Sequence, residues 1–380
     1  MTYNYSGMSK FSNILVTGGA GYIGSVLTRK LVSSKYNVKV LDSLIFGQDG
    51  ISDLISNNLV KLFVDDIRNK EIITDILKDV DCVIHLAAIV GDPLCSKIPK
   101  AAKQINEFAT KHIIDSCKKV GVQRFIFAST CSNYGSALGT VNEDTPLESL
   151  SLYSETKIKS EFNVLNSQEN FFEPCVLRFA TAYGLSPRMR FDLLLQEFIR
   201  DALVDKKISI FGPNHWRPLV HVDDIASACI IAIENSKNIS GEIYNVGDNE
   251  QNYTKKHLIA EEFEILIKRL KVKGNPISMN DVIWHNENGK KLPPHVLAGN
   301  GSILFRDNHF SSGLSQISHP ECRATPVRQH PVDKLALPIR PQTFRRMTTC
   351  NISRSRVRSA TIFFNRPFSS SRSRSRRISD

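Results

Sequence analysis

The sequence lacks any apolar run of about 18 residues or more, so we expect no membrane-spanning helix. Its beginning, MTYNYSGMSKFSN, lacks the apolar centre of a secretory signal. The eight cysteines form no C-x-x-C pair, which argues against a zinc site and against a disulfide framework. These absences favour a protein of the reducing cytoplasm that binds no metal.

Most of the chain also lacks an excess of positive charge, although the formal net charge is +11. Residues 1–260 hold 28 Lys and Arg against 29 Asp and Glu, whereas residues 331–380 hold twelve against two. The end of the chain, 369-SSSRSRSRRISD-380, is low-complexity sequence whose like charges repel one another. We therefore predict a disordered basic tail over residues 263–380, and expect nucleic-acid binding only through this tail.

Apolar and amphipathic segments alternate from residue 13 to about residue 250. The expected strands are 13–17, 37–42, 60–65, 81–87, 124–129, 174–180 and 243–247, and the expected helices are 22–34, 69–78, 100–120, 154–169, 191–203 and 223–235. Continuous apolar strands between helices predict a parallel sheet covered on both faces. The expected fold class is α/β, a Rossmann-type doubly wound sheet with ligands at the carboxyl ends of its strands.

The motif 17-TGGAGYIG-24 lies directly between the first expected strand and the first expected helix. Gly18 and Gly21 permit a tight turn and the close approach of a pyrophosphate, and Gly24 lets the helix pack on the strand. Asp42 ends the second expected strand, where a carboxylate binds the adenosine ribose and repels a 2′-phosphate. The motif predicts a dinucleotide site that prefers NAD to NADP.

Tyr153 and Lys157 are four residues apart in an expected helix, so their side chains share one face. A nearby ammonium stabilises a phenolate, which would lower the pKa of Tyr153 toward the range of general acid–base catalysis. The same spacing also fits an ordinary pair on a helix surface.

Four motifs in chain order resemble the extended short-chain dehydrogenase/reductases: 17-TGGAGYIG-24, 65-DDIRN-69, 85-HLAA-88 and 153-YSETK-157. Among these enzymes, the sequence from about residue 12 to 260 is most similar to the NAD-dependent sugar-nucleotide epimerases and dehydratases. The resemblance implies NAD as the cofactor, a nucleotide-sugar substrate and a homodimer.

The resemblance also divides the chain. It implies an NAD-binding domain over residues 12–175 and a smaller substrate-binding lobe over residues 176–262, interleaved with the sheet. After 252-NYTKKHLIAEEF-263 the family continues with an Arg/Asp substrate motif that this sequence does not contain. A frameshifted or mispredicted end, a diverged lobe and a fused basic tail all remain open, and we expect the lobe to be incomplete.

The resemblance assigns catalytic roles to three residues. Tyr153 exchanges a proton with a sugar hydroxyl, Lys157 tunes Tyr153 and holds the nicotinamide ribose, and Thr130 shares the proton. Thr130 lies in 129-STCSNYG-135, where Cys131 and Ser132 stand in place of the Asp–Glu pair of the 4,6-dehydratases. Elimination of water therefore lacks its acid and base. We expect Cys131 to be a packing residue, because the local sequence pairs it with no base.

The cofactor site is assigned in the same way. Asp66 and Ile67 are expected to cover the adenine, and Asn106 to lie near the nicotinamide, although it also fits a plain polar helix position. The full expected set is Gly18, Gly21, Tyr22, Ile23, Gly24, Asp42, Asp66, Ile67, Leu86, Ala87, Ala88, Asn106, Ser129, Tyr153 and Lys157.

Three residues are expected to bind the substrate. Thr181 replaces the Asn of the family pattern in 177-LRFATAYG-184, and Arg190 begins the substrate loop as an expected phosphate contact. Arg217 matches an Arg that grips the nucleotide pyrophosphate, for which planar bidentate donors are suited.

Three functions follow from these residues. The main prediction is an NAD-dependent nucleotide-sugar epimerase that acts by transient hydride transfer through a keto-sugar intermediate. The second is an NAD(P)-dependent nucleotide-sugar reductase or dehydrogenase that uses the same three catalytic residues. The third is an inactive dinucleotide-binding protein whose Arg/Ser tail associates with RNA.

Overall fold

The computed structural model describes residues 10–136, 139–259 and 282–285. The strands are β1 (Asn13–Thr17), β2 (Asn37–Asp42), β3 (Val60–Val64), β4 (Cys82–His85), β5 (Arg124–Thr130), β6 (Glu173–Phe179), β7 (Thr181–Tyr183), β8 (Ile208–Phe211), β9 (Trp216–His221), β10 (Glu242–Val246), β11 (Asn252–Thr254) and β12 (Val282–His285). The helices are α1 (Tyr22–Ser33), α2 (Ser52–Ser56), α3 (Lys70–Ile76), α4 (Asp92–Lys97), α5 (Pro99–Lys103), α6 (Thr110–Val120), α7 (Leu152–Asn166), α8 (Leu194–Val204), α9 (Val222–Glu234), α10 (Ser236–Ile239) and α11 (Lys255–His257), with short turns η1 (Asp49–Ile51), η2 (Gln104–Ala109), η3 (Cys131–Tyr134) and η4 (Asn249–Gln251).

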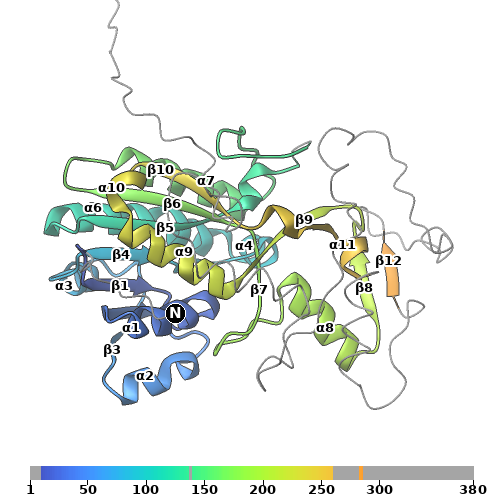
Figure 1. Cartoon of the computed structure of the whole chain (residues 1–380), viewed down its shortest axis with the longest axis horizontal. Helices are drawn as coiled ribbons and strands as arrows, with labels where there is room; N and C mark the ends of the chain where they lie inside the picture. Colours follow the sequence, from blue (N-terminus) through green and yellow to red (C-terminus); the bar gives the residue numbers. More distant parts are fainter. Residues whose placement is uncertain (1–9, 137–138, 260–281, 286–380) are drawn as a thin grey trace, which may run out of the picture.

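Seven parallel strands form the main sheet in the order β10-β6-β5-β4-β1-β2-β3 (Figure 1). The chain builds outward from β1 in one direction through β2 and β3, and in the other through β4, β5 and β6. The predicted doubly wound Rossmann-type fold is thus confirmed. The point where the direction reverses, between β1 and β4, is where such sheets leave a crevice for ligands.

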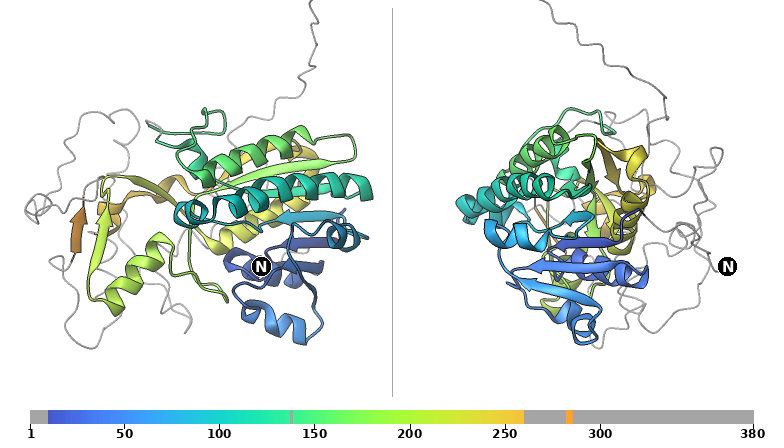
Figure 2. Two further views of the ribbon diagram at one scale, coloured as in Figure 1. Left: turned by 180° about the vertical axis from the view of Figure 1, so that it is seen from behind. Right: turned by 90° about the vertical axis from the view of Figure 1, so that its left-hand side faces the viewer.

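Helices cover both faces of this sheet (Figure 2). Strand β1 shows why its sequence is apolar throughout: Ile14 and Val16 pack in the core beneath α1 and α9, and Leu15 packs in the core beneath α3, α6 and α7. All three side chains are fully buried, because successive residues of a strand point to opposite faces. This packing holds the strands in place in the sheet, and so fixes the positions of their carboxyl ends.

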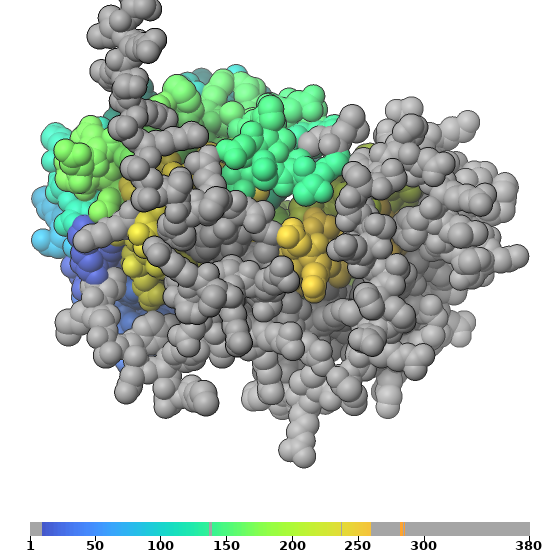
Figure 3. All heavy atoms as spheres, turned by 45° about the horizontal axis from the view of Figure 1, so that its top comes forward, coloured from blue at the N-terminus to red at the C-terminus, as the bar shows by residue number. Residues whose placement is uncertain are grey.

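Helix α7 begins at a sharp capping signal. The Ser151 hydroxyl accepts a hydrogen bond from the Ser154 amide, and the Ser154 hydroxyl accepts one from the Ser151 amide, each 3.2 Å long. This reciprocal arrangement satisfies amides that the first turn of a helix otherwise leaves unpaired. Residues 139–150, which lead to this start, lie on the molecular surface (Figure 3).

The smaller lobe gathers α8, β8, α11 and β12 at one end of the sheet (Figure 1). A three-stranded sheet in the order β11-β9-β7 leads into it, and β8 pairs in parallel with β12. The lobe is interleaved with the main sheet, because α9 and β10 return to the sheet after β9. Strand β12 lies within residues 263–380, which we expected to be a disordered tail, so that expectation is wrong for residues 282–285.

The rest of the predicted tail lies outside the described residues, and the boundaries proposed for the three parts of the chain remain a prediction. Within the part of the chain that the structure describes, no helix is both long enough and apolar enough to span a membrane.

Candidate active site

The glycine-rich turn joins the end of β1 to the start of α1. Gly18 has a φ of +74°, and a Cβ added to it would lie 2.9 Å from the backbone nitrogen of Ala87. A Cβ on Gly24 would lie 2.0 Å from the carbonyl oxygen of Gly18. The turn therefore requires glycine at both positions, as the motif predicts, and its tight backbone leaves the N-terminus of α1 open to an anion.

Asp42 stands at the end of β2, beside this turn. Its carboxylate accepts hydrogen bonds from the amides of Ala20 at 3.0 Å and Leu44 at 2.9 Å. These contacts fix the carboxylate next to the glycine turn, where a ribose hydroxyl would reach it. The second expected carboxylate, Asp66, is held by the Arg68 guanidinium, which lowers its pKa and keeps it ionised.

The segment after β4 lies on the other side of the end of β1. The amide of Leu86 bonds to the Thr17 carbonyl at 3.1 Å, and the amide of Ala87 bonds to the Thr17 hydroxyl at 3.3 Å. Leu86, Ala87 and Ala88 thus run beside the end of β1, at the switch point of the sheet. Ile67, also expected here, is 6 % exposed and packs into the core below.

Asn106 lies in η2, a π-helical turn between α5 and α6. Its side-chain amide exchanges two hydrogen bonds with the backbone of Ile89, of 2.8 and 2.9 Å. The backbone carbonyl of Asn106 accepts hydrogen bonds from the hydroxyls of Thr110 and Ser160, both at 2.7 Å. A π-turn widens the helix and frees a carbonyl for such contacts. Asn106 therefore ties α7 to the segment after β4, and is more than a plain polar helix residue.

Tyr153 and Thr130 approach each other at the carboxyl end of β5, where the Thr130 hydroxyl acts to lower the pKa of Tyr153. The Thr130 hydroxyl also accepts from the Ser132 amide at 3.1 Å. Burial raises the pKa of Tyr153 to about 12, and the nearby Arg190 guanidinium opposes this rise. We expected Lys157 to lower the pKa of Tyr153, and this is wrong for the structure: desolvation outweighs the nearby charges.

Lys157 lies one turn further along α7 and is 4 % exposed. Its ammonium sits over the Phe127 ring of β5, 4.1 Å from the ring centroid. Burial lowers the pKa of Lys157 to about 7, because an enclosed ammonium loses its hydration, while the Glu161 carboxylate opposes the shift. The amine therefore titrates near neutral pH and is buried one helical turn from Tyr153.

A buried polar network beneath these groups was not predicted from the sequence. Glu161 of α7 pairs with Arg178 of β6 at 2.7 Å, and both side chains are almost fully buried. Ser129 donates to Glu161 at 2.5 Å, and Arg178 donates to the Tyr134 hydroxyl at 2.9 Å. Glu161 follows Lys157 by four residues, which places both side chains on the same face of α7. This spacing is the feature of the sequence from which the position of Glu161 near the site could have been predicted.

The three expected substrate residues lie in different settings. Thr181 begins β7, which continues the chain from the end of β6. Arg190 forms an ion pair with Asp192 at 2.6 Å and lies near Tyr153. Its expected role as a phosphate contact stays a prediction, which this position permits. Arg217 is exposed on β9 and faces the charge of Asp92 on α4.

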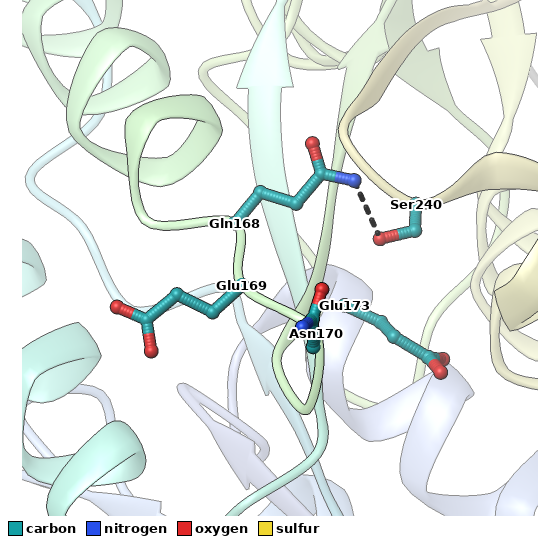
Figure 4. A pocket seen from close by; sticks show the side chains of 5 residues that line it. All are labelled: Gln168, Glu169, Asn170, Glu173 and Ser240. Atoms are coloured by element: carbon teal, nitrogen blue, oxygen red, sulfur yellow. Dashed lines mark hydrogen bonds between the residues drawn. The ribbon is translucent and has the colours of Figure 1, made fainter.

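The crevice just described is not the depression drawn in Figure 4. That depression is lined by Gln168, Glu169, Asn170, Glu173 and Ser240, at the amino ends of β6 and β10. It lies at the opposite edge of the sheet from Thr130 and holds no group that the crevice uses. In the described ranges, no three His, Cys, Asp or Glu side chains gather in a way that could hold a metal ion.

The fold and this site define an enzyme of the Rossmann class that moves hydride between a dinucleotide and a substrate alcohol. The family model for the NAD dependent epimerase/dehydratase family matches residues 14–247. The chain belongs to this family, and its cofactor is NAD.

Individual relatives agree with this assignment. An uncharacterized UDP-glucose epimerase of Bacillus subtilis is 34% identical over 250 residues, covering 63% of this chain and 77% of the relative. The dTDP-D-glucose 4,6-dehydratase of Dictyostelium discoideum is 30% identical over 256 residues, covering 62% and 58% of the two chains. The crystal structure of UDP-glucuronic acid 4-epimerase from Bacillus cereus with UDP-glucuronic acid and NAD matches with a TM-score of 0.64 and 30% identity, covering 74% of this chain and 88% of that one.

Proposed function

We propose that this chain is an NAD-dependent epimerase of a nucleotide sugar, acting through a transient keto-sugar. The observation that carries the proposal is the approach of the Thr130 hydroxyl to the buried Tyr153 phenol at the carboxyl end of β5, one helical turn from the buried Lys157. A phenol and a hydroxyl that share a proton can take it from a sugar alcohol and later return it. The epimerases similar to this chain make a UDP-sugar the first substrate to test.

The chain's own residues fit NAD. The cradle made by Gly18 and Gly24 leaves no room for side chains, and Asp42 presents a fixed carboxylate beside it. Bound NAD supplies an acceptor that takes up the hydride and then gives it back. Gly18, Gly21, Tyr22, Ile23, Gly24 and Asp42 would hold its adenosine and pyrophosphate, and Ser129, Asn106 and Lys157 would lie toward its nicotinamide side.

The proton steps belong to Tyr153 and Thr130. Tyr153 as phenolate accepts the proton of the sugar hydroxyl while the sugar carbon loses hydride and becomes a ketone. After the ketone turns its other face, the carbon regains hydride and Tyr153 returns the proton to the oxygen. Arg190 supplies positive charge that favours the phenolate during this cycle.

Epimerisation is favoured over dehydration because the two positions after Thr130 carry no carboxylate. Cys131 donates to the Arg178 carbonyl at 3.4 Å, and burial raises its thiol pKa to about 12. Such a thiol is a poor acid or base near neutral pH. Ser132 uses its backbone amide and hydroxyl on Thr130. Elimination of water would need a general acid and base that this turn does not supply.

One experiment separates the candidate reactions. The purified chain with NAD is incubated with UDP-glucose and with UDP-glucuronic acid, and proton NMR follows the sugar while absorbance at the NADH band is recorded. An epimerase converts one sugar to its epimer without a net gain of NADH. Accumulation of NADH matching the sugar consumed would instead establish the dehydrogenase, and NAD binding without turnover would establish the inactive protein.

We also propose that the chain works as a homodimer. Phe108 of η2 and Phe162 of α7 are 58% and 69% exposed, and these two elements pack against each other through the Ser160–Asn106 hydrogen bond. Large exposed aromatics on adjacent helices suit a self-complementary interface. Sedimentation of the wild type and of Phe162→Glu tests the proposal: the variant should sediment as a monomer.

A further inference from the structure

The strongest unassigned feature is the buried ion pair between Glu161 and Arg178. Their side chains are 3 % and 2 % exposed, respectively. Removing two charges from water is costly, and apolar residues of similar size usually serve stability as well or better. The pair also lies directly below the residues that carry the proposed chemistry, which suggests a role beyond packing.

Glu161 contacts both elements that carry the reactive groups. Its Oε1 accepts from the Ser129 hydroxyl at 2.5 Å and from the Asn133 amide at 2.8 Å. Ser129 directly precedes Thr130 in β5, and Asn133 lies in the turn η3 that follows. Glu161 itself lies one turn after Lys157 on α7. A single carboxylate thus joins the end of β5 to the helix of Tyr153 and Lys157.

Arg178 holds the carboxylate from the other side. Its Nε and Nη2 donate to Glu161 at 3.0 and 2.7 Å, and its Nη1 donates to the Tyr134 hydroxyl at 2.9 Å. Tyr134 in turn donates to Asn245 of β10 at 2.7 Å. Each oxygen of Glu161 is therefore held by donors from β5, η3 or β6, so the carboxylate has a fixed position.

We propose that Glu161 is a positioning residue for hydride transfer, holding Thr130 and Lys157 in register and keeping a negative charge beside the Lys157 ammonium. The inference rests on the proposed function, because it concerns the same proton-transfer groups. Glu161 acts through Ser129 and Lys157.

The surroundings of Lys157 leave Glu161 as the main negative charge near it. Phe127 of β5 lies under the ammonium, Cys95 of α4 is a buried thiol, and His85 of β4 is buried and held neutral. Tyr153 of α7, with Asp92 and Arg190 around it, lies one turn away. Glu161 raises the proton affinity of Lys157 against the effect of burial. Its loss should therefore favour the neutral amine.

The test is the titration of Lys157 in Glu161→Gln, read by competitive acetylation with trace acetic anhydride and mass spectrometry of the Lys157 peptide. This readout needs no turnover. We expect the midpoint to move down by about one pH unit, since removing an opposite charge shifts a pKa by that order. The alkaline limb of kcat for sugar epimerisation should move by the same amount.

Two further variants keep the result interpretable. Glu161→Gln with Arg178→Gln removes both charges, so the fold holds no unpaired arginine, and the midpoint should still fall. Arg124→Gln is the matched control: Arg124 is fully buried at the opposite end of β5 and donates to the carbonyls of Ala232 and Glu173. It should lose stability and leave the Lys157 midpoint unchanged.

An unchanged midpoint in both Glu161 variants, with only a lower melting temperature, would overturn the inference. A shifted midpoint in a chain that turns over no nucleotide sugar would support the positioning role of Glu161 and contradict the proposed function. Turnover of a nucleotide sugar with an unshifted Lys157 midpoint would support the proposed function and contradict the positioning role of Glu161.

Discussion

Thr130 at the end of β5 lies near the Tyr153 phenol of α7, where its hydroxyl acts to lower the pKa of Tyr153 against the effect of burial. The fold thereby brings together two hydroxyl groups that are 23 positions apart in the chain. The pair sits where the carboxyl ends of the central strands meet, so its chemistry is directed at the crevice and not at the solvent.

Tyr153→Phe should abolish most turnover while leaving NAD binding intact. The substitution removes one hydroxyl that exchanges the proton, and such groups contribute roughly 10²- to 10⁴-fold to a rate. Stopped-flow mixing with a UDP-sugar measures the turnover rate, and fluorescence titration measures NAD binding. Thr130→Ser keeps a hydroxyl and serves as the control, with turnover close to that of the wild type.

Lys157 should make stability depend on pH in a defined window. Its pKa is about 7 in the folded chain and near its ordinary 10.5 in the unfolded chain. Between these values the unfolded chain binds more protons, so the free energy of unfolding rises with pH, by at most about 1.4 kcal/mol per pH unit. Below pH 7 both states are protonated and the contribution is constant.

Urea unfolding of the wild type and of Lys157→Met at pH 6, 7, 8 and 9 measures this effect. The stability of the wild type relative to the variant should be level from pH 6 to 7 and increase from pH 7 to 9. A difference that stays flat over the whole range would contradict the burial of the ammonium as the cause.

Asp224 should show the opposite trend. Burial and the neighbouring Asp223 raise the pKa of Asp224 to about 7, from an ordinary value of 3.8. The folded chain binds the extra proton between these values, so the stability of the wild type falls as pH rises from 4 to 7, then levels off. Relative to Asp224→Asn the loss should be about 2 kcal/mol, reduced by partial solvent screening.

The two glycines of the turn should respond differently to alanine. Gly24→Ala places a Cβ 2.0 Å from the Gly18 carbonyl, so the fold itself should be lost or strongly destabilised. At Gly21, where a Cβ lies 3.2 Å from the same oxygen, the chain should still fold. Its NAD affinity should nevertheless fall at least tenfold, because the methyl group would meet the pyrophosphate. Thermal melts and NAD titration of both variants distinguish folding from binding.

Local patterns carried most of the fold. Each strand of the main sheet was expected within a few residues of its position, because a doubly covered strand must be apolar on both faces, as Ile14, Leu15 and Val16 are. The capping pair Ser151 and Ser154 likewise fixes the start of α7 through contacts three residues apart. Such signals are readable because cause and consequence lie within one turn or one strand.

What the sequence left out depends on distant pairings. Nothing near residue 282 indicates that it pairs with β8, about seventy residues earlier. The pKa of Tyr153 was expected to fall because Lys157 is nearby in sequence, but it is set by how much water the surrounding elements exclude. Glu161 and Arg178 belong to different elements, and only the packing of α7 on β6 shows that they form a pair.

The position of β10 in the chain has a consequence for folding during synthesis on the ribosome. Strand β10 follows β7, β8 and β9 in the chain, so β6 is synthesised well before its partner strand. Val176 of β6, for example, pairs with Ile243 of β10. Until residue 246 has emerged from the exit tunnel, β6 is an open edge strand, and open edges invite pairing with other chains. Nascent chains stalled before β10 should therefore be the ones that aggregate or recruit chaperones.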